Sequence, residues 1–573
     1  MFYLKVKETQ NKFSTLYNFF YGLIIGFPIS VILLVVNVLY IFNKDFDFFT
    51  NWNIGCILTF LCLSTLVYIF KIFMNFKWRK MMMLEFLDIV HNSKIPSKSP
   101  KVVYVYTTKN DFMESRLLQN LEQTYSNIEY WISIGDPNDK YLKQIQKFSK
   151  KHNIKLHILD KESKSKSDNL NHFLKNSGAK FDYLLIGDAD VAFDKKFVEN
   201  SLKIFYSNRS IRLGFVSSTI FNYRSNNVFT NSILHFENKE FVLSHQSSNY
   251  LTNLSSNLYS ACCLISNQML KEMGNQFPNS NLEDWYTEKF ADKNLWVGVV
   301  SPLSIAMQSF DKNIWANLNR LSRLYTWGIK YYKNDFFLNY NVKYSVQNER
   351  DFNNVFLGFY FILGFILGTF FLWFLVINFD FLIRNKFFLT LFFSIIVNLI
   401  LIVITKSYYG RKIGPTDGFS RFLLSFFYSV ALGIFILKNW FKSFVLSKYS
   451  TFSNPYKKID KNSSNWKIIK IHVYYLIIYS IILFLGNFLL FWFKTYQINA
   501  GYIYLIILFD SIFFMLFLYE LSLLILHWAG KISSNKSYNE NDFVYCKNDF
   551  VLQTKVINEY NDKIFEKDKS SNV

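Results

Sequence analysis

Two aspartates follow a buried-strand pattern in the middle of the chain. In YLLIGDADVAF, residues 183–193, Asp188 and Asp190 are separated by a single alanine. Residues two apart in an extended segment point to the same side, so both carboxylates can face one ion. Carboxylates with no His or Cys nearby suit a hard cation, Mg²⁺ or Mn²⁺, which keeps positions for phosphate oxygens. The alternative is a solvated turn, because aspartate is common where strands end.

The segments before these aspartates alternate between strand and helix patterns. We expect strands at 101–111, 129–139, 155–160 and 183–190, with helices at 114–126 and 166–177 and a Lys-rich helix before the third strand. This alternation predicts a parallel α/β sheet, in which ligands bind outside the carboxyl ends of the strands. Asp136 ends the second strand and Asp188 and Asp190 end the fourth, so the acids are expected at one edge.

The two ends of the chain are strongly apolar. Of the 573 residues 51% are hydrophobic, with 64 Phe and 37 Tyr. A bilayer core of roughly 30 Å needs about 20 apolar residues in helical form. The uncharged runs occupy 13–43, 51–70, 352–379, 387–405, 422–437, 471–493 and 496–528. Most of these runs reach that length. Core helices of a soluble protein are the alternative, but such proteins rarely need so many runs of this length.

This distribution predicts four parts. We expect a transmembrane pair at 1–80, a cytoplasmic domain at 81–351, a transmembrane block at 352–530 and a polar cytoplasmic tail at 531–573. The first run lacks the short apolar segment and cleavage site of a signal peptide, so we interpret it as an anchor.

The net charge of +21 is concentrated beside the apolar runs. Basic residues cluster at 77–80, 410–412 and 438–470, as expected for cytoplasmic flanks attracted to anionic membrane lipids. Nucleic-acid binding would need this charge on one folded domain, so nucleic acid is not an expected partner. The five cysteines form no CxxC pair, so the sequence suggests neither a zinc site nor a disulfide framework, and we expect Cys262 and Cys263 to be packing residues.

Five stretches then line up in order with a known family. They are LLQNLEQTYSNIEYWISIGDPND (117–139), KSDNLNHFL (166–174), FDYLLIGDADVAF (181–193), LEDW (282–285) and NRLSRLYTW (319–327). The order resembles the family 2 membrane glycosyltransferases, which include cellulose, chitin and hyaluronan synthases. The resemblance covers about residues 100–335. It implies an α/β cytoplasmic domain, GT-A-like with a mostly parallel sheet, inserted between α-helical transmembrane segments.

The resemblance also implies a role for each matching residue. The family transfers a sugar from a nucleotide diphosphate to a hydroxyl with inversion. Asp284 would be the base for that hydroxyl, with Glu283 beside it in the substrate site. Asp136 would lie near the nucleotide base or ribose, Lys166 near the diphosphate or uracil, Asp188 by the nucleotide, and Asp190 with Asp188 on a Mg²⁺ or Mn²⁺ cofactor. The alternative for Asp284 is an acid in the first turn of a helix, favoured by the macrodipole.

Arg320, Arg323 and Trp327 fall at i, i+3 and i+7, so a helix places them on one face. Arginines there can grip a diphosphate, and an indole can carry a sugar ring. The alternative is an amphipathic helix near 313–333 that lies at the membrane surface with snorkelling arginines.

The implied donor is a cytoplasmic UDP-hexose, so the catalytic domain is expected inside. Three full spans between 352 and 437 would put the Lys-rich stretch 438–470 outside, against the positive-inside rule. A partial or re-entrant 422–437 avoids this, and six full spans plus that partial one are favoured over seven. Asp510 and Glu520 lie within the last apolar tract, where acids usually face a bundle interior or an aqueous path.

These features favour a multi-pass cell-membrane enzyme that builds an extracellular or capsular polysaccharide, processively, from a UDP-hexose. One alternative is a non-processive enzyme that glycosylates a single lipid acceptor. The other, from a different class, is a transporter or sensor that only binds the nucleotide sugar, in which Asp284 would have no task.

Overall fold

The computed structural model describes part of the 573-residue chain. The described residues are 79–207, 212–222, 224–225, 258–259, 261–280, 282–308, single positions between 318 and 330 and between 431 and 435, then 438–448, 464–495, 500–532, 543–544 and single positions between 556 and 561. The apolar runs predicted at 13–43, 51–70, 352–379 and 387–405 lie outside them.

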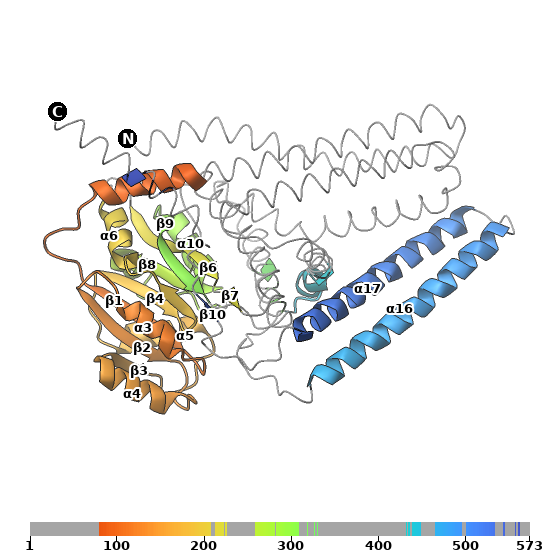
Figure 1. The fold of residues 1–573 in the computed structure, drawn as a ribbon, viewed down its shortest axis with the longest axis horizontal. Helices are drawn as coiled ribbons and strands as arrows, with labels where there is room; N and C mark the ends of the chain where they lie inside the picture. Colours follow the sequence, from red (N-terminus) through yellow and green to blue (C-terminus); the bar gives the residue numbers. More distant parts are fainter. Residues whose placement is uncertain are drawn as a thin grey trace.

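An eight-stranded sheet forms the centre of the domain (Figure 1). Its order is β3 (Lys155–Ile158), β2 (Ile128–Ile134), β1 (Val102–Thr108), β4 (Tyr183–Asp188), β8 (Cys262–Ser266), β6 (Leu213–Asn222), β9 (Val297–Gln308) and β5 (Val191–Phe193). The strands β3, β2, β1 and β4 are mutually parallel, as the sequence predicts. Beyond β4 the sheet is mixed, because β8 runs antiparallel to both of its neighbours, and the prediction of a mostly parallel sheet holds only for the first half.

Helices cover both faces of the sheet and create two apolar cores. Every residue of β1 is buried, and its side chains alternate between the two cores, with Tyr104 and Tyr106 in one and Val103 and Val105 in the other. The helices α3 (Glu114–Leu121), α4 (Leu142–His152) and α6 (Phe197–Ser207) pack on the first core, and α5 (Lys166–Asn176), α9 (Asn267–Glu272) and α10 (Glu283–Lys293) on the second. The result is a GT-A-like α/β domain of three layers.

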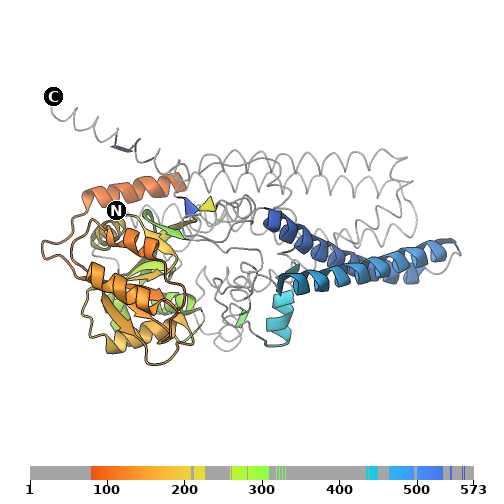
Figure 2. The ribbon, with the colours of Figure 1, turned by 60° about the horizontal axis from the view of Figure 1, so that its bottom comes forward.

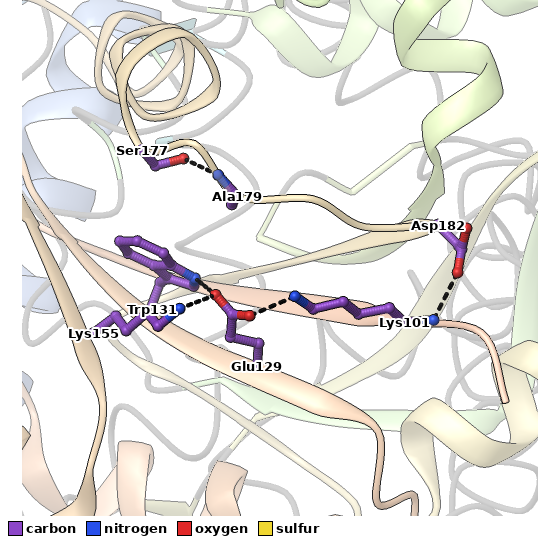
Figure 3. Close-up of polar contacts among 7 residues, drawn as sticks. All are labelled: Lys101, Glu129, Trp131, Lys155, Ser177, Ala179 and Asp182. Atoms are coloured by element: carbon purple, nitrogen blue, oxygen red, sulfur yellow. Dashed lines mark hydrogen bonds and ion pairs between the residues drawn. The ribbon is translucent and has the colours of Figure 1, made fainter.

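An ion network joins the amino ends of the first three strands (Figure 3). The carboxylate of Glu129 lies 2.6 Å from Nζ of Lys101 and 2.9 Å from Nζ of Lys155, and it accepts a hydrogen bond of 2.7 Å from Nε1 of Trp131. Burial raises the pKa of Glu129, but these three donors outweigh it and bring the pKa to about 2. Lys101 N also donates to Asp182, just before β4. The network aligns the strand starts and lies at the edge opposite the predicted site.

Two long helices follow the domain. The antiparallel pair α16 (Ser464–Thr495) and α17 (Ala500–Ile532) lies to one side of it (Figures 1 and 2). Within them, Lys470–Phe493 and Leu505–Leu526 are long and apolar enough to cross a membrane. Large apolar side chains of α16, among them Phe484 and Phe491, are exposed.

Two acids of α17 face the partner helix. Glu520 of α17 pairs with the imidazole Nδ1 of His472 on α16. Asp510 is buried against Gly486, where a Cβ would lie 2.6 Å from the carboxylate oxygen. The expectation that acids in this tract face the interior of a helix bundle therefore holds within the pair.

The chain after α17 returns to the α/β domain. The short strand β10 (Phe543–Val544) pairs antiparallel with β7 (Arg224–Ser225). Val556 is buried against Met83, and the Tyr560 hydroxyl donates a hydrogen bond of 2.6 Å to Asp88. Met83 and Asp88 belong to the helix over residues 79–92, so the C-terminal segment contacts the domain at two separate places.

Candidate active site

The carboxyl ends of β1, β2 and β4 meet at one edge of the sheet. Thr107 of β1 is level with Asp188 of β4, and Thr108 is level with Ile134 of β2. Asp136 follows β2 by two residues, so the structure brings Asp136 and Asp188 to the same edge, as the strand order predicts.

Asp188 is held by a lysine and a threonine. Lys166 Nζ forms an ion pair with Oδ1 of Asp188, and Thr107 Oγ1 donates to the same oxygen at 3.2 Å. Lys166 is the first residue of α5, whose N-cap Ser165 accepts from the backbone N of Asp168. Burial lowers the pKa of Lys166, but Asp188 and Glu283 outweigh it and raise the pKa above its ordinary value. Lys166 therefore stays protonated at the end of β4.

Asp190 lies in the turn between β4 and β5, not in the extended segment that the sequence pattern implies. Its side chain is 9% exposed, and Oδ2 accepts from Nε2 of Gln308 at 3.3 Å. The Tyr106 hydroxyl donates to the carbonyl of Ala189 at 3.1 Å and fixes this turn. The turn arises because β4 pairs with β1, whereas β5 crosses to pair with β9.

Asn120 braces the strand that follows this turn. Its Nδ2 donates to the carbonyl of Val191 at 2.9 Å, and its Oδ1 accepts from the backbone N of Phe193 at 2.6 Å. The same Nδ2 lies 2.8 Å from the Tyr104 hydroxyl, which packs so close to Gly187 that a Cβ there would lie 2.7 Å from it. Asn120 belongs to the LLQNLEQ stretch, but its spacing from residues 191–193 carries no signal of this contact.

The loop after β2 is organised by two aspartates with different tasks. Asp139 is buried and accepts from the backbone N of Asn110 and of Tyr141. Asp136 is half-buried, and its Oδ2 accepts from Nδ2 of Asn110 at 3.0 Å. Asn110 has a φ of 62°, a left-handed conformation that asparagine tolerates. Asp136 is therefore at the edge of the site, whereas Asp139 supports the loop.

Asp111 is a site residue that the sequence analysis missed. Its Oδ1 accepts from Thr108 Oγ1 at 2.9 Å and from the backbone N of Lys109 at 2.8 Å. Burial raises the pKa of Asp111 to about 6, against these two hydrogen bonds and with a smaller contribution from Asp188. The polar run TTKND after β1 was the available signal.

Glu283 and Asp284 open helix α10. Glu283 is 7% exposed, and Asp284 is half-buried with Oδ1 accepting from the backbone N of Trp285 at 3.0 Å. The charge of Glu283 helps to raise the pKa of Lys166. Burial raises the pKa of the Cys263 thiol well above its ordinary range, and the charges of Asp284 and Asp188 contribute to the shift, whereas that of Lys166 opposes it. The start of α10 is therefore close to the Lys166–Asp188 pair. Asp284 lies in the first turn of α10. This position fits a base for the acceptor hydroxyl, and it also fits an acid that only stabilises the start of the helix.

The two cysteines of β8 are buried next to these charged groups. Cys262 and Cys263 are free and buried, as predicted, and burial raises the pKa of Cys262 to about 12. Cys262 is level with Gly187 of β4. Both thiols are inert packing groups.

The predicted residues Arg320, Arg323 and Trp327 lie outside the described residues. Around them, Leu318, Ser322 and Thr326 are helical and buried, and Ser322 Oγ donates to Oδ1 of Asn439 at 2.6 Å.

The residues that could hold a divalent cation are Asp188 and Asp190. Within the described part of the chain, no group of three or more His, Cys, Asp or Glu side chains could hold a metal ion. Two hard oxygen donors at one turn fit Mg²⁺ or Mn²⁺, provided that phosphate and water complete the coordination. The donor set does not fit zinc.

The glycosyl transferase family 2 model matches residues 102–274. This range contains Asp136, Lys166, Asp188 and Asp190, and it ends before Glu283 and Asp284. No curated protein matches the chain. Residues 102–274 belong to glycosyl transferase family 2, and the chain is a glycosyltransferase.

Several solved structures are similar. A mannosyltransferase, PcManGT from Pyrobaculum calidifontis, in complex with GDP-Man and Mn²⁺, is 13% identical over 68% of this chain and 100% of its own, with a TM-score of 0.38. TarS of S. aureus is 14% identical over 39% of each chain, with a TM-score of 0.26. TarS 1–349 in complex with UDP-GlcNAc is 14% identical over 46% of this chain and 80% of its own, with a TM-score of 0.27.

Proposed function

We propose that the protein is a membrane-embedded inverting glycosyltransferase that transfers a hexose from a UDP-sugar to a growing extracellular or capsular polysaccharide, processively. The observation that carries the proposal is the meeting of the Lys166–Asp188 pair with the acidic start of α10 at the carboxyl edge of a family 2 domain. A cation beside a carboxylate turn suits a nucleotide diphosphate, and a separate carboxylate nearby suits a sugar hydroxyl.

The step needs one base and a stabilised leaving group. Asp284 accepts the proton of the acceptor hydroxyl, and that oxygen forms a bond to the anomeric carbon. The bond between this carbon and the diphosphate oxygen breaks on the opposite side, and UDP leaves with the electron pair. Lys166 stays protonated and stabilises the negative charge that grows on the diphosphate.

A divalent cation is part of the proposal. Asp190, with Asp188, would hold Mg²⁺ or Mn²⁺. When bound, the cation supplies Lewis-acid stabilisation of the departing diphosphate. Asp136 contributes to the nucleotide side, and Arg320, Arg323 and Trp327 remain proposed acceptor-side or diphosphate contacts.

A multi-pass arrangement in the cell membrane, with the catalytic domain cytoplasmic, completes the proposal. The contact between Ser322 and Asn439 and the return of residues 543–560 to the domain support a common side for residues 439 and 543. If α16 and α17 cross as a hairpin, both of its outer ends share that side. The Lys-rich 438–470 is then cytoplasmic, and an even number of crossings lies between 331 and 438. This favours six full spans, with 422–437 as a partial one.

The proposal is tested by product formation in membranes that contain the full chain. UDP-glucose or UDP-galactose with Mg²⁺ or Mn²⁺ is expected to yield polymer and UDP. Asp190→Asn and Asp284→Asn should each lower the rate by at least about 100-fold, the scale of general-base and electrostatic terms. Full activity of both variants would overturn the site assignment.

Product length separates the acceptors. A ladder of sizes supports processive synthesis, whereas a single labelled glycolipid supports the alternative of one lipid acceptor. Binding of the UDP-sugar without turnover would support the transporter or sensor.

A further inference from the structure

Helix α5 contacts both halves of the site. Its first residue, Lys166, pairs with Asp188 at the end of β4. One and five residues further along, Ser167 and Asn171 turn to the segment that precedes α10. Ser167 Oγ donates to the carbonyl of Ser280 at 3.3 Å. Residues four apart share one helix face, so a single face of α5 holds this segment.

Asn171 makes the stronger of these contacts. Its Nδ2 donates to the carbonyl of Phe277 at 2.9 Å, and its Oδ1 accepts from the backbone N of Phe277 at 2.6 Å. The amide therefore satisfies both backbone groups of one residue, and the Phe277 side chain is itself buried in the second core. This pair of bonds fixes the position and orientation of the backbone at residue 277.

The path from Phe277 to the acids of α10 is short and bonded. The backbone N of Ser280 donates to the carbonyl of Pro278 at 2.8 Å, and Ser280 Oγ accepts from the backbone N of Leu282 at 3.1 Å. Leu282 is buried, and Glu283 begins the helix at the next residue. These bonds connect the segment held by Asn171 to the start of α10.

Asn120 is a counterpart on the other side of the site. It bonds the backbone carbonyl of Val191 and the backbone N of Phe193, just after Asp190. Both asparagines thus use one amide to hold a backbone segment next to an acid. Asn120 holds the turn of Asp188 and Asp190, and Asn171 holds the approach to Asp284.

We propose that Asn171 is a positioning residue for the acceptor base, and that it fixes Asp284 relative to the donor groups Lys166 and Asp188. The inference rests on the proposed function, because it assigns the base to Asp284. It predicts that loss of the Asn171 brace impairs the chemical step and leaves donor binding intact, since Lys166 and Asp188 remain in place. Loss of the Asn120 brace should instead weaken binding of the donor and its cation.

The experiment compares Asn171→Ala, Asn120→Ala and a matched control, Asn176→Ala, in the full chain. Asn176 is an exposed residue at the end of the same helix. For Asn171→Ala we expect kcat to fall about 10- to 100-fold, the scale of a 1 Å misplacement, with KM for UDP-glucose within about twofold of wild type. Asn120→Ala should raise that KM, and Asn176→Ala should change neither value.

A milder variant guards against a folding defect. Ser167→Ala removes one contact of the same face and should lower kcat by a smaller factor with the donor KM unchanged. Unchanged kcat in Asn171→Ala would overturn the inference, as would a parallel loss of kcat and of UDP binding measured by titration calorimetry. Absence of transfer by the wild-type protein would instead overturn the proposed function.

Discussion

At the scale of single residues, Lys166 and Asp188 form a direct ion pair at the carboxyl end of β4. The strand pattern places Asp136 and Asp188 at strand ends, whereas Lys166 and Asp284 were singled out by the family resemblance. Asn120 and Asn171 could not be assigned from the sequence, because their partners lie 73 and 106 positions away and the contacts depend on packing. The ion pair between Lys166 and Asp188 is a contact that the sequence did not predict, because the expectation placed Lys166 near the diphosphate or uracil.

This pairing predicts a coupled response to substitution. Lys166→Gln leaves the Asp188 carboxylate without its ammonium partner, so the KM for the UDP-sugar should rise about tenfold or more. Because the two residues interact directly, the effects of Lys166→Gln and Asp188→Asn should not add. The double variant should differ from additivity by about 0.5–3 kcal/mol in a double-mutant cycle on kcat/KM. Simple additivity would contradict a direct interaction.

Asp111 predicts a pH effect on stability. The pKa of about 6 in the folded protein lies above the ordinary 3.8, so the folded state retains this proton longer than the unfolded state. Stability therefore falls as pH rises from about 4 to about 6, and the loss is complete above pH 6. The side chain of Asp111→Asn stays neutral. At pH 8 its free energy of unfolding should therefore exceed that of wild type by about 2–3 kcal/mol, on the scale of 1.36 kcal/mol per pKa unit. Thermal unfolding should show this as a higher melting temperature. The two proteins should converge at pH 4. A constant difference across this range would contradict the prediction.

At the scale of elements, the strand–helix alternation from 101 to 190 predicts β1 to β4 and the helices between them. The predicted strands overrun the observed ones by a few residues at their polar ends, because those residues turn into the site. The mixed half of the sheet could not be predicted, since the antiparallel pairing of β8 depends on its insertion between β4 and β6. Helix α3 ends at Leu121 rather than 126, and Thr124 bonds the carbonyl of Lys195 instead.

The network at the strand starts predicts a second pH effect of opposite sign. The pKa of Glu129 is about 2 in the folded protein and 4.5 ordinarily, so its stabilisation is present above pH 4.5 and is lost as pH falls toward 2. Glu129→Gln should destabilise the protein by about 1–2 kcal/mol at pH 7, after allowance for solvent screening of this partly exposed group. The difference should disappear near pH 2.5. Lys175→Gln, at an exposed position of α5, is the control, and an equal effect there would contradict a specific network.

At the scale of the whole molecule, the apolar runs and the charge distribution predict a membrane protein, and α16 and α17 are long and apolar enough to agree. The contacts of the C-terminal segment with β7 and with the helix over 79–92 could not be predicted from the polar composition of the tail. A two-residue strand and one buried valine leave no periodic signal.

The proposed arrangement predicts which residues a membrane-impermeant thiol reagent can reach. In a background without the native cysteines, Thr495→Cys at the end of α16 should react in intact cells, whereas Lys448→Cys should react only after permeabilisation. Both positions are exposed in the structure. Labelling of both from the same side would contradict a membrane hairpin with cytoplasmic ends.

The return of the C-terminal segment also has a consequence for the continuity of the chain. The helix hairpin is attached to the catalytic domain beyond both of its ends, through Asn439 on one side and through β10 and Tyr560 on the other. Covalent linkage between domain and hairpin is therefore duplicated by noncovalent contact. In a protein divided into two polypeptides after residue 448, the contacts of β10 and Tyr560 would join the second polypeptide to the first, so the gene could be split there and its halves expressed together.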